Sequence, residues 1–194
     1  MTRGADSAGP DVVGAEGAVQ GATQGASGPL AGLRPATTAD IPALAALARA
    51  AYAVYVPRLG GEPPAMHPDF AAAIAKGHCR LVAAPAVTAA TQGKNPIAYL
   101  IACPAPPGEA PPGEHAWLVD HVAVHPDHQG RGLGRALLAL AEAEGRAAGF
   151  TTLRLITNVA MTENQALYHR LGFHETGRRR RKGTSIIDYA KPLA

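Results

Sequence analysis

The 194-residue sequence predicts one mixed α/β domain: a twisted, mostly antiparallel sheet with helices on both faces and a C-terminal hairpin. Short apolar runs typical of strands alternate with segments whose apolar residues recur at helical spacing. Short loops join the middle strands, which favours antiparallel pairing. No segment repeats, and a chain of this length can bury a core of its own.

The first part of the chain differs from the rest. Residues 1–29 are rich in Gly, Ala, Ser, Gln and Pro and contain no aromatic residue. Such a segment buries too little apolar surface to offset the entropy lost on ordering. We expect a disordered tail over residues 1–29, followed by a single domain over residues 30–194.

The domain is expected to begin with a strand near residues 32–34 and a helix that starts within residues 37–40. Pro42 falls in the first helical turn, where proline is tolerated. Residues 52–66 are interpreted as a linker with at most a short helix, because Pro57 and several Gly and Pro residues interrupt them. The apolar face of the first helix comprises Leu44, Leu47 and Ala51.

The remaining elements follow from periodicity and from stop signals. Gly77, Gly149 and Gly172 each come directly after a helical pattern, as C-terminal glycines do. Thr162 and Gln165 fit a capping box at the start of the last helix. The predicted helices cover residues 69–76, 131–148 and 162–171, and the predicted strands cover residues 78–84, 96–103, 116–124, 152–157, 173–180 and 184–191.

The most informative stretch joins a strand, a glycine-rich turn and a helix. Gly130, Gly132 and Gly134 stand at alternate positions just before the helical pattern. Glycine allows close approach of a ligand, and free N–H groups at a helix start attract anions. Arg131 and Arg135 add guanidinium groups that suit phosphate. These residues predict a diphosphate site, and the alternative is a glycine-rich turn without a ligand.

Two other phosphate-binding motifs fit this stretch poorly. A dinucleotide fingerprint needs a third glycine where this chain has Arg135 or Leu137, and an acid near the position of Arg154. A Walker-type loop needs Lys-Ser or Lys-Thr after the glycines, and neither follows.

Residues 124–136 resemble the signature of the GCN5-related N-acetyltransferases (GNAT), a Gln/Arg-x-x-Gly-x-Gly/Ala run, with Gln129, Gly132 and Gly134 in place. The resemblance covers roughly residues 31–193 and implies a GNAT-like fold, acetyl-CoA as the donor and an amine as the usual acceptor. Three further segments resemble the family's first strand and helix start, its fifth strand, and its last helix with the start of the closing hairpin: residues 33–40, 153–158 and 163–173.

The resemblance also implies where the donor binds. Backbone N–H groups of residues 122–124 would meet the thioester oxyanion, where the family's strand splays from its neighbour. Asn158 and Asn164 would hydrogen-bond to amides of the pantetheine arm. The expected donor-binding residues are Val122, Ala123, Val124, Gln129, Gly130, Arg131, Gly132, Leu133, Gly134, Arg135, Asn158 and Asn164.

The departing thiolate needs an acid that is neutral at pH 7, which suits tyrosine. Tyr168 lies four residues after Asn164, so the two share a helix face. A tyrosine at the matching place commonly serves as the thiol's acid in the family. The alternative is a tyrosine that only packs beside Leu171.

Asp120 is the expected base. It precedes Val122 by two positions and should point to the same side of the strand. Many relatives carry Glu there, and the shorter Asp favours proton transfer through water. His121, His125 and His128 are alternative bases. His121 and His125 would lie about 13 Å apart on an extended strand, too far to share an ion, so no metal is expected.

The distribution of basic residues bears on whether the protein binds nucleic acid. Residues 178–182 hold five of the 18 basic residues, and the rest of the chain has 13 basic against 15 acidic residues. This run could contact nucleic acid or an acidic partner, but it has no interleaved aromatic residues, and charge on an edge hairpin also discourages strand pairing. We therefore expect no nucleic-acid partner.

Cys79 and Cys103 lack metal spacing and are expected to be small buried residues of a reduced, cytoplasmic protein. No run of 18 apolar residues occurs, so no membrane segment is expected. The first residues also lack the layout of a signal peptide.

The sequence thus predicts an acetyl-CoA-dependent N-acetyltransferase in which a primary amine attacks the thioester directly. The alternative is a non-catalytic acyl-CoA-binding or sensing domain, and the presence of both Tyr168 and Asp120 favours the enzyme. The acceptor could be a small amine, an amino acid, an antibiotic or a protein amine, and a homodimer is left open. Acceptor choice is expected to lie in residues 52–78 and in the hairpin turns.

Overall fold

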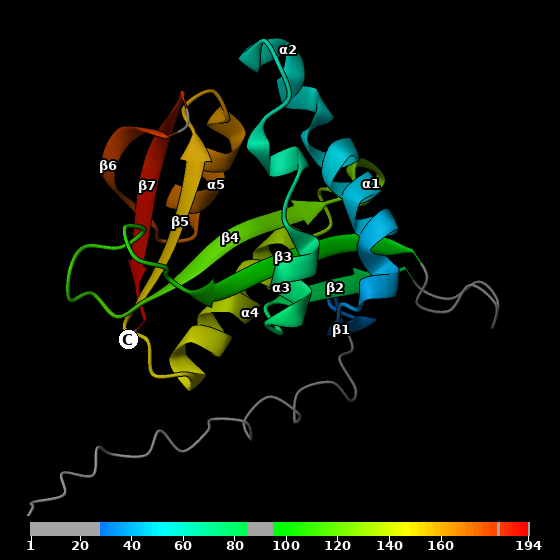
Figure 1. Ribbon diagram of the computed structural model, residues 1–194, viewed down its shortest axis with the longest axis horizontal. Coiled ribbons are helices and arrows are strands. Elements are labelled where there is room, and N and C mark those ends of the chain that lie inside the picture. Colours follow the sequence, from blue (N-terminus) through cyan, green and yellow to red (C-terminus); the bar gives the residue numbers. More distant parts are fainter. Residues whose placement is uncertain (1–27, 85–94, 182, 194) are drawn as a thin grey trace, which may run out of the picture.

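The computed structural model describes residues 28–84, 95–181 and 183–193. Most of the expected tail over residues 1–29 therefore lies outside the described residues. The described chain forms one sheet of seven strands in the order β1-β2-β3-β4-β5-β7-β6, with helices on both faces (Figure 1). The predicted fold class is confirmed.

The strands agree with the predicted ones within one or two residues. All neighbouring strands pair antiparallel except β4 and β5, which are parallel and are joined through helix α4. The strands are β1 (Leu33–Pro35), β2 (Cys79–Ala83), β3 (Pro96–Pro104), β4 (Ala116–Val124), β5 (Thr152–Asn158), β6 (His174–Arg181) and β7 (Thr184–Pro192).

The helices divide between the two faces of the sheet. Helices α1 and α3 cover one face, and α4 and α5 cover the other (Figure 1). Each face has its own buried core, centred on Leu44 and Phe70 on one side and on Leu137 and Tyr168 on the other. The helices are α1 (Ile41–Tyr52), α2 (Val56–Leu59), α3 (Phe70–Ala75), α4 (Leu133–Ala147) and α5 (Thr162–Arg170).

The helical run Thr38–Leu59 is long and apolar enough to span a membrane by length and composition alone. Leu44, Leu47 and Ala48 of this run are almost fully buried against the sheet. One face of the run therefore packs against the sheet, and 28% of its most apolar 18-residue window is buried.

A β-bulge interrupts strand β4 in its middle. Val119 is opposite Ala102 and His121 is opposite Ile101, so Asp120 is the extra residue. A bulge breaks the simple alternation of side chains. The two-residue alternation from which the direction of Asp120 was predicted therefore does not hold across the bulge.

Strands β4 and β5 separate beyond the bulge. Their parallel pairing runs only from Ala116 to Val119 on β4, whereas β4 continues beside β3 to Val124. The open gap between the two strands is the splay that the family resemblance implied. The gap exposes one backbone edge of β4.

The start of α5 differs from the predicted capping box. Met161 is the N-cap residue, and Thr162 already lies inside the helix. The Gln165 Nε2 atom donates to the Val159 carbonyl at 2.7 Å instead of to a capping residue. The predicted stop is confirmed, because Gly172 has a left-handed φ of 84°.

Acidic partners largely neutralise the basic run of β6. Arg178 pairs with Glu175, whereas Arg179 holds Asp188. Arg179 and Arg181 both contact Glu109, at 2.9 and 2.7 Å. The run is therefore an ion-paired edge strand.

Candidate active site

The glycine-rich turn shapes the start of α4. Gly130 and Gly132 have left-handed φ angles of 74° and 81°, a conformation that favours glycine. Gly134 is helical, and a Cβ there would lie 3.9 Å from Val124 Cγ2, an ordinary contact. The first two glycines are thus needed by the turn itself, whereas Gly134 leaves open space in front of the helix.

The backbone hydrogen bonds of the described chain leave out the N–H groups of this turn. The Gln129 N–H bonds to Pro126 at 3.2 Å, and the Ala136 N–H bonds to Gly132 at 3.0 Å. Within the described ranges, no backbone acceptor meets the N–H groups of residues 130–135. Free donors at the start of a 15-residue helix are suited to an anion.

A cavity of about 720 Å³ extends from this turn to α5. We call it the donor cavity. Ten of the twelve predicted donor-binding residues line it: Val122, Ala123, Val124, Gln129, Gly130, Gly132, Leu133, Gly134, Arg135 and Asn164.

The other two predicted donor residues lie elsewhere. Arg131 lines neither cavity of this region, and Asn158 lines a second one. The Asn158 Oδ1 atom accepts from the Ala160 N–H at 2.8 Å, so it stabilises its own loop.

The exposed edge of β4 faces the donor cavity. The His125 N–H bonds to Ile97 of β3 at 2.8 Å, and alternation along an antiparallel ladder then directs the Ala123 N–H toward β3 as well. The same alternation turns the N–H groups of Val122 and Val124 toward the open gap. The Val124 carbonyl on that edge accepts from Gln129 Nε2 at 3.1 Å. Of the three N–H groups predicted to meet the oxyanion, Val122 and Val124 are therefore the better placed.

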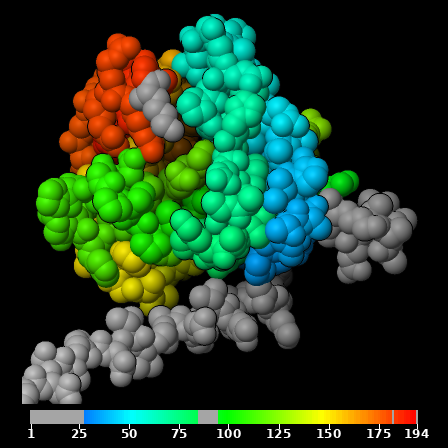
Figure 2. Space-filling view, viewed as in Figure 1, coloured from blue at the N-terminus to red at the C-terminus, as the bar shows by residue number. Residues whose placement is uncertain are grey.

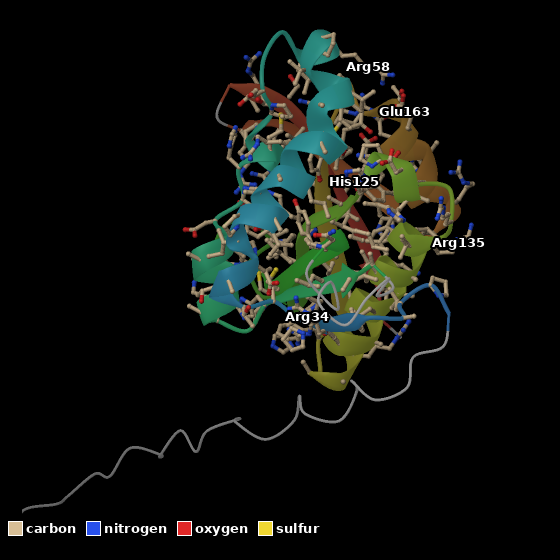
Figure 3. The ribbon with its side chains drawn as sticks, turned by 90° about the vertical axis from the view of Figure 1, so that its right-hand side faces the viewer. Arg34, Arg58, His125, Arg135 and Glu163 are labelled. Carbon is tan, nitrogen blue, oxygen red and sulfur yellow. The ribbon has the colours of Figure 1, made fainter. Side chains whose placement is uncertain are left out.

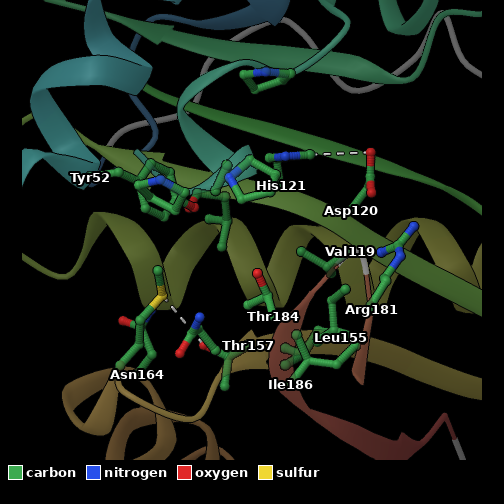
Figure 4. A pocket seen from close by; sticks show the side chains of 18 of the residues that line it. Tyr52, Val119, Asp120, His121, Leu155, Thr157, Asn164, Arg181, Thr184 and Ile186 are labelled. Atoms are coloured by element: carbon green, nitrogen blue, oxygen red, sulfur yellow. Dashed lines mark hydrogen bonds and ion pairs between the residues drawn. The ribbon is translucent and has the colours of Figure 1, made fainter. Parts of the chain in front are cut away.

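A second cavity of about 370 Å³ lies on the other side of this gap. We call it the acceptor cavity, because residues from the two regions expected to choose the acceptor line it. The segment of residues 63–69, the β4 bulge, the end of β5 and the β6–β7 hairpin surround it (Figure 4). Figure 2 shows a hollow between the hairpin, coloured orange, and the teal segment near residues 56–77.

Four residues line both cavities: Tyr52, Val122, Asn164 and Tyr168. Tyr168 is 6% exposed, and its ring packs against Phe173 and Tyr189 with centroid separations of 5.9 and 5.7 Å. Its hydroxyl has no hydrogen-bond partner in the described part of the chain. Burial, reinforced by nearby tyrosines, raises the pKa of Tyr168 above its ordinary value, so the hydroxyl stays protonated.

Asp120 and His121 form a pair on the wall of the acceptor cavity. His121 Nδ1 lies 3.1 Å from Asp120 Oδ2 (Figure 4). Burial acts to raise the pKa of Asp120, but the contact with His121 and the charge of Arg181 outweigh it, so this pKa is lowered. The carboxylate is therefore ionised at neutral pH and is a weak proton acceptor.

The sequence of residues 46–173 matches the model of the acetyltransferase (GNAT) family. The chain belongs to this family. A mycothiol acetyltransferase of Cellulomonas flavigena is 43% identical over 74 residues, which cover 37% of this chain and 21% of that protein. The chain thus matches about a fifth of the relative's length.

Solved GNAT structures share the fold. A GNAT-family acetyltransferase from Listeria monocytogenes has a TM-score of 0.61 at 17% identity, covering 82% of this chain and 93% of its own. The ribosomal-protein-S18-alanine N-acetyltransferase of Escherichia coli has a TM-score of 0.57 at 24% identity, covering 84% and 93%. The likeness at these identities concerns the fold alone.

Sequence reasoning missed Tyr52 of this GNAT domain. The Tyr52 hydroxyl donates to the Val122 carbonyl at 3.1 Å and so ties α1 to the open edge of β4. Residue 52 was assigned to a linker, although Leu44, Ala48 and Tyr52 recur every four residues. That spacing is the signal that would have extended the helix through Tyr52.

The other histidines are less well placed as bases. His128 lines the donor cavity, whereas His125 lines neither cavity and accepts from the Asp127 N–H at 3.3 Å. No group of three or more His, Cys, Asp or Glu residues that could hold a metal is found among the described residues.

An ion pair bridges two segments beside the donor cavity. Arg58 of α2 lies 2.7 Å from Glu163 of α5, and Glu163 lines that cavity (Figure 3). Both side chains are about half exposed, so the pair adds little stability.

Proposed function

We propose that this GNAT protein is an acetyl-CoA-dependent N-acetyltransferase that moves the acetyl group to a primary amine. The observation that carries the proposal is the meeting of the two cavities at Val122 and Tyr168. One cavity begins at a helix start suited to an anion, and the other contains an ionised carboxylate suited to an ammonium group. A donor and an acceptor could therefore meet at this junction.

The donor's diphosphate would accept hydrogen bonds from the N–H groups of residues 130–135, with Arg135 adding positive charge. Its pantetheine arm would follow the open edge of β4 and the side chain of Asn164. The N–H groups of Val122 and Val124 would then donate to the thioester oxygen, whose negative charge grows in the transition state.

The amine nitrogen attacks the thioester carbon, so a C–N bond forms and the C–S bond breaks. The acceptor enters as an ammonium ion and must first lose a proton. We propose that Asp120 and His121 act together here: Asp120 stabilises the positive charge, and His121 or a water molecule carries the proton away.

Tyr168 supports the departing sulfur. Its protonated hydroxyl can donate a hydrogen bond to the thiolate as negative charge develops there. The raised pKa of Tyr168 makes it a weak acid, so stabilisation of the charge by this hydrogen bond is the larger part of the proposed role.

Turnover tests the proposal. Purified protein with acetyl-CoA should release CoA thiol when primary amines are added, and mass spectrometry should detect the acetylated amine. A binding or sensing domain would bind the donor and release no thiol with any amine. The cytoplasmic location and the homodimer remain predictions.

A further inference from the structure

The acceptor cavity combines an apolar wall with a few polar groups. Its apolar part includes Pro63, Pro68 and Leu155. Asp120 and Arg181 bring opposite charges to the same cavity, where Figure 4 shows both side chains beside each other. Within the protein Asp120 contacts His121 and Arg181 contacts Glu109, and an acceptor that carries both an ammonium and a carboxylate group could add a second partner to each.

Arg181 retains donors for a ligand. One of its terminal nitrogens contacts Glu109 at 2.7 Å, and the side chain is 38% exposed. Glu109 is shared with Arg179, which also binds Asp188 through two nitrogens. The other guanidinium nitrogens of Arg181 have no partner within the described ranges, and guanidinium donors suit a carboxylate.

A residue with a hydroxyl group lies on the strand opposite Arg181. Thr184 is opposite Arg181 in the β6–β7 pairing, and both residues line the acceptor cavity. The Thr184 hydroxyl has no hydrogen-bond partner in the described part of the chain. Together the two side chains offer a charged and a neutral donor at one end of the cavity.

We propose that the acceptor is an amine that also bears a free carboxylate, as a free amino acid does. Its ammonium group would face Asp120, and its carboxylate would accept hydrogen bonds from Arg181, with Thr184 as a further donor in the cavity. The cavity of about 370 Å³ has the size of a small-molecule site. This inference rests on the proposed function and narrows its acceptor. The amino terminus of a protein would bring an amide in place of the carboxylate.

The test compares acceptors that differ only at the carboxylate. Amino acids are assayed for thiol release from acetyl-CoA beside the corresponding carboxamides. Because the two amines differ in basicity, the informative quantity is the ratio of their kcat/KM values and its change on substitution. Wild type should prefer the amino acid, and Arg181→Gln should reduce the ratio by about tenfold or more.

Two further variants serve as a matched control and as a conservative substitution. Arg180→Gln removes a charge from the same strand at a residue whose guanidinium bonds to Gly183 outside the cavity, and it should leave the ratio within about twofold. Arg181→Lys keeps a positive charge without the guanidinium geometry and should retain part of the preference for the amino acid over the carboxamide. This variant also keeps the proposal testable if Arg181→Gln does not fold.

The outcomes separate the two proposals. Equal or better use of carboxamides or peptides by wild type, or an unchanged ratio in Arg181→Gln, would overturn the carboxylate assignment and leave the acetyltransferase intact. Absence of thiol release with every amine would instead overturn the proposed function.

Discussion

Tyr168 has a neutral hydroxyl at the junction of the two cavities. Tyr168→Phe keeps the ring that packs on Phe173 and Tyr189 but removes the hydroxyl. We expect kcat to fall by roughly 10- to 10⁴-fold with little change in acetyl-CoA affinity, because the lost interaction is made in the transition state. Steady-state rates and donor titration check this, and an unchanged kcat would assign the tyrosine to packing.

The Asp120 carboxylate should be ionised throughout the neutral pH range. Its pKa is lowered below the ordinary aspartate value, so protonation occurs only in acid and the active, ionised form is full at neutral pH. Asp120→Asn should therefore lower kcat/KM by a factor of about 10 to 10³ that stays nearly constant between about pH 5 and 9.

The measurement is a pH profile with two acceptors of different basicity, since the acceptor's own ammonium also gives a rising limb. A limb near pH 6–7 that persists in both proteins would mark a histidine. A limb between pH 5 and 8 that disappears in Asp120→Asn would show that Asp120 itself titrates there, contrary to its lowered pKa.

Single residues show where sequence reasoning works and where it stops. The glycines of the turn were predictable because a left-handed φ and an open helix start need glycine. The bulge at Asp120 was not predictable, because it depends on the pairing of β3 with β4, which no local pattern records. The partnership of Tyr52 with Val122 joins residues 70 positions apart and is likewise invisible in sequence.

A capping box with a charged carboxylate lies in the 3₁₀ turn Thr38–Asp40, directly before helix α1. Asp40 accepts from Thr37 at 2.8 Å through both the N–H and the hydroxyl, and Arg34 binds it with two nitrogens at 2.8 and 2.7 Å. The Arg34 guanidinium, against the opposing effect of burial, holds the pKa of Asp40 far below its usual range. Asp40→Asn should lower the melting temperature at pH 7 by about 3–12 °C.

This stabilisation has a defined pH dependence. The unfolded chain binds a proton at Asp40 near pH 3.9, whereas the folded chain does so only at much lower pH. The contribution is full above pH 3.9 and declines as the pH falls toward the folded pKa. Melting curves of wild type and variant should therefore converge below about pH 4, and a gap that stays constant down to pH 2 would contradict the assignment.

The turn before α4 should control donor binding without controlling the fold. Gly134→Val adds a Cβ that makes only an ordinary contact with Val124, and its methyl groups should enter the space before the free N–H groups. We expect stabilisation by CoA to be lost while the unliganded melting temperature changes by only a few degrees. Ala139→Val, at an exposed position of the same helix, is the matched control and should retain the CoA effect. If CoA still stabilised both variants, the donor would have to bind somewhere other than this turn.

Elements were easier to predict than their ends. Strands and helices were found because apolar periodicity and C-terminal glycines are local signals. The capping box at Thr162 was wrong because the chain enters α5 one residue earlier, where Met161 takes the N-cap position. Which strands stand side by side, including the parallel pair β4 and β5, depends on contacts between distant segments.

The whole molecule places two cavities on either side of a splayed strand. The sequence predicted the donor side well because one short turn carries most of it. The acceptor side is assembled from residues 63–69, the bulge, β5 and the closing hairpin. No single segment encodes that wall, so its chemistry became visible only in the folded chain.

Acetyl-CoA is proposed to bind in the cavity at the glycine-rich turn. We would measure the melting temperature of the protein with acetyl-CoA, CoA, NADH and ATP at matched concentrations. At 100 times Kd a ligand stabilises the native state by about 2.7 kcal/mol, or about 5–11 °C for a chain of this size. We expect such a rise with acetyl-CoA and CoA and a much smaller one with NADH and ATP. No rise with acetyl-CoA, or an equal rise with NADH, would contradict the claim.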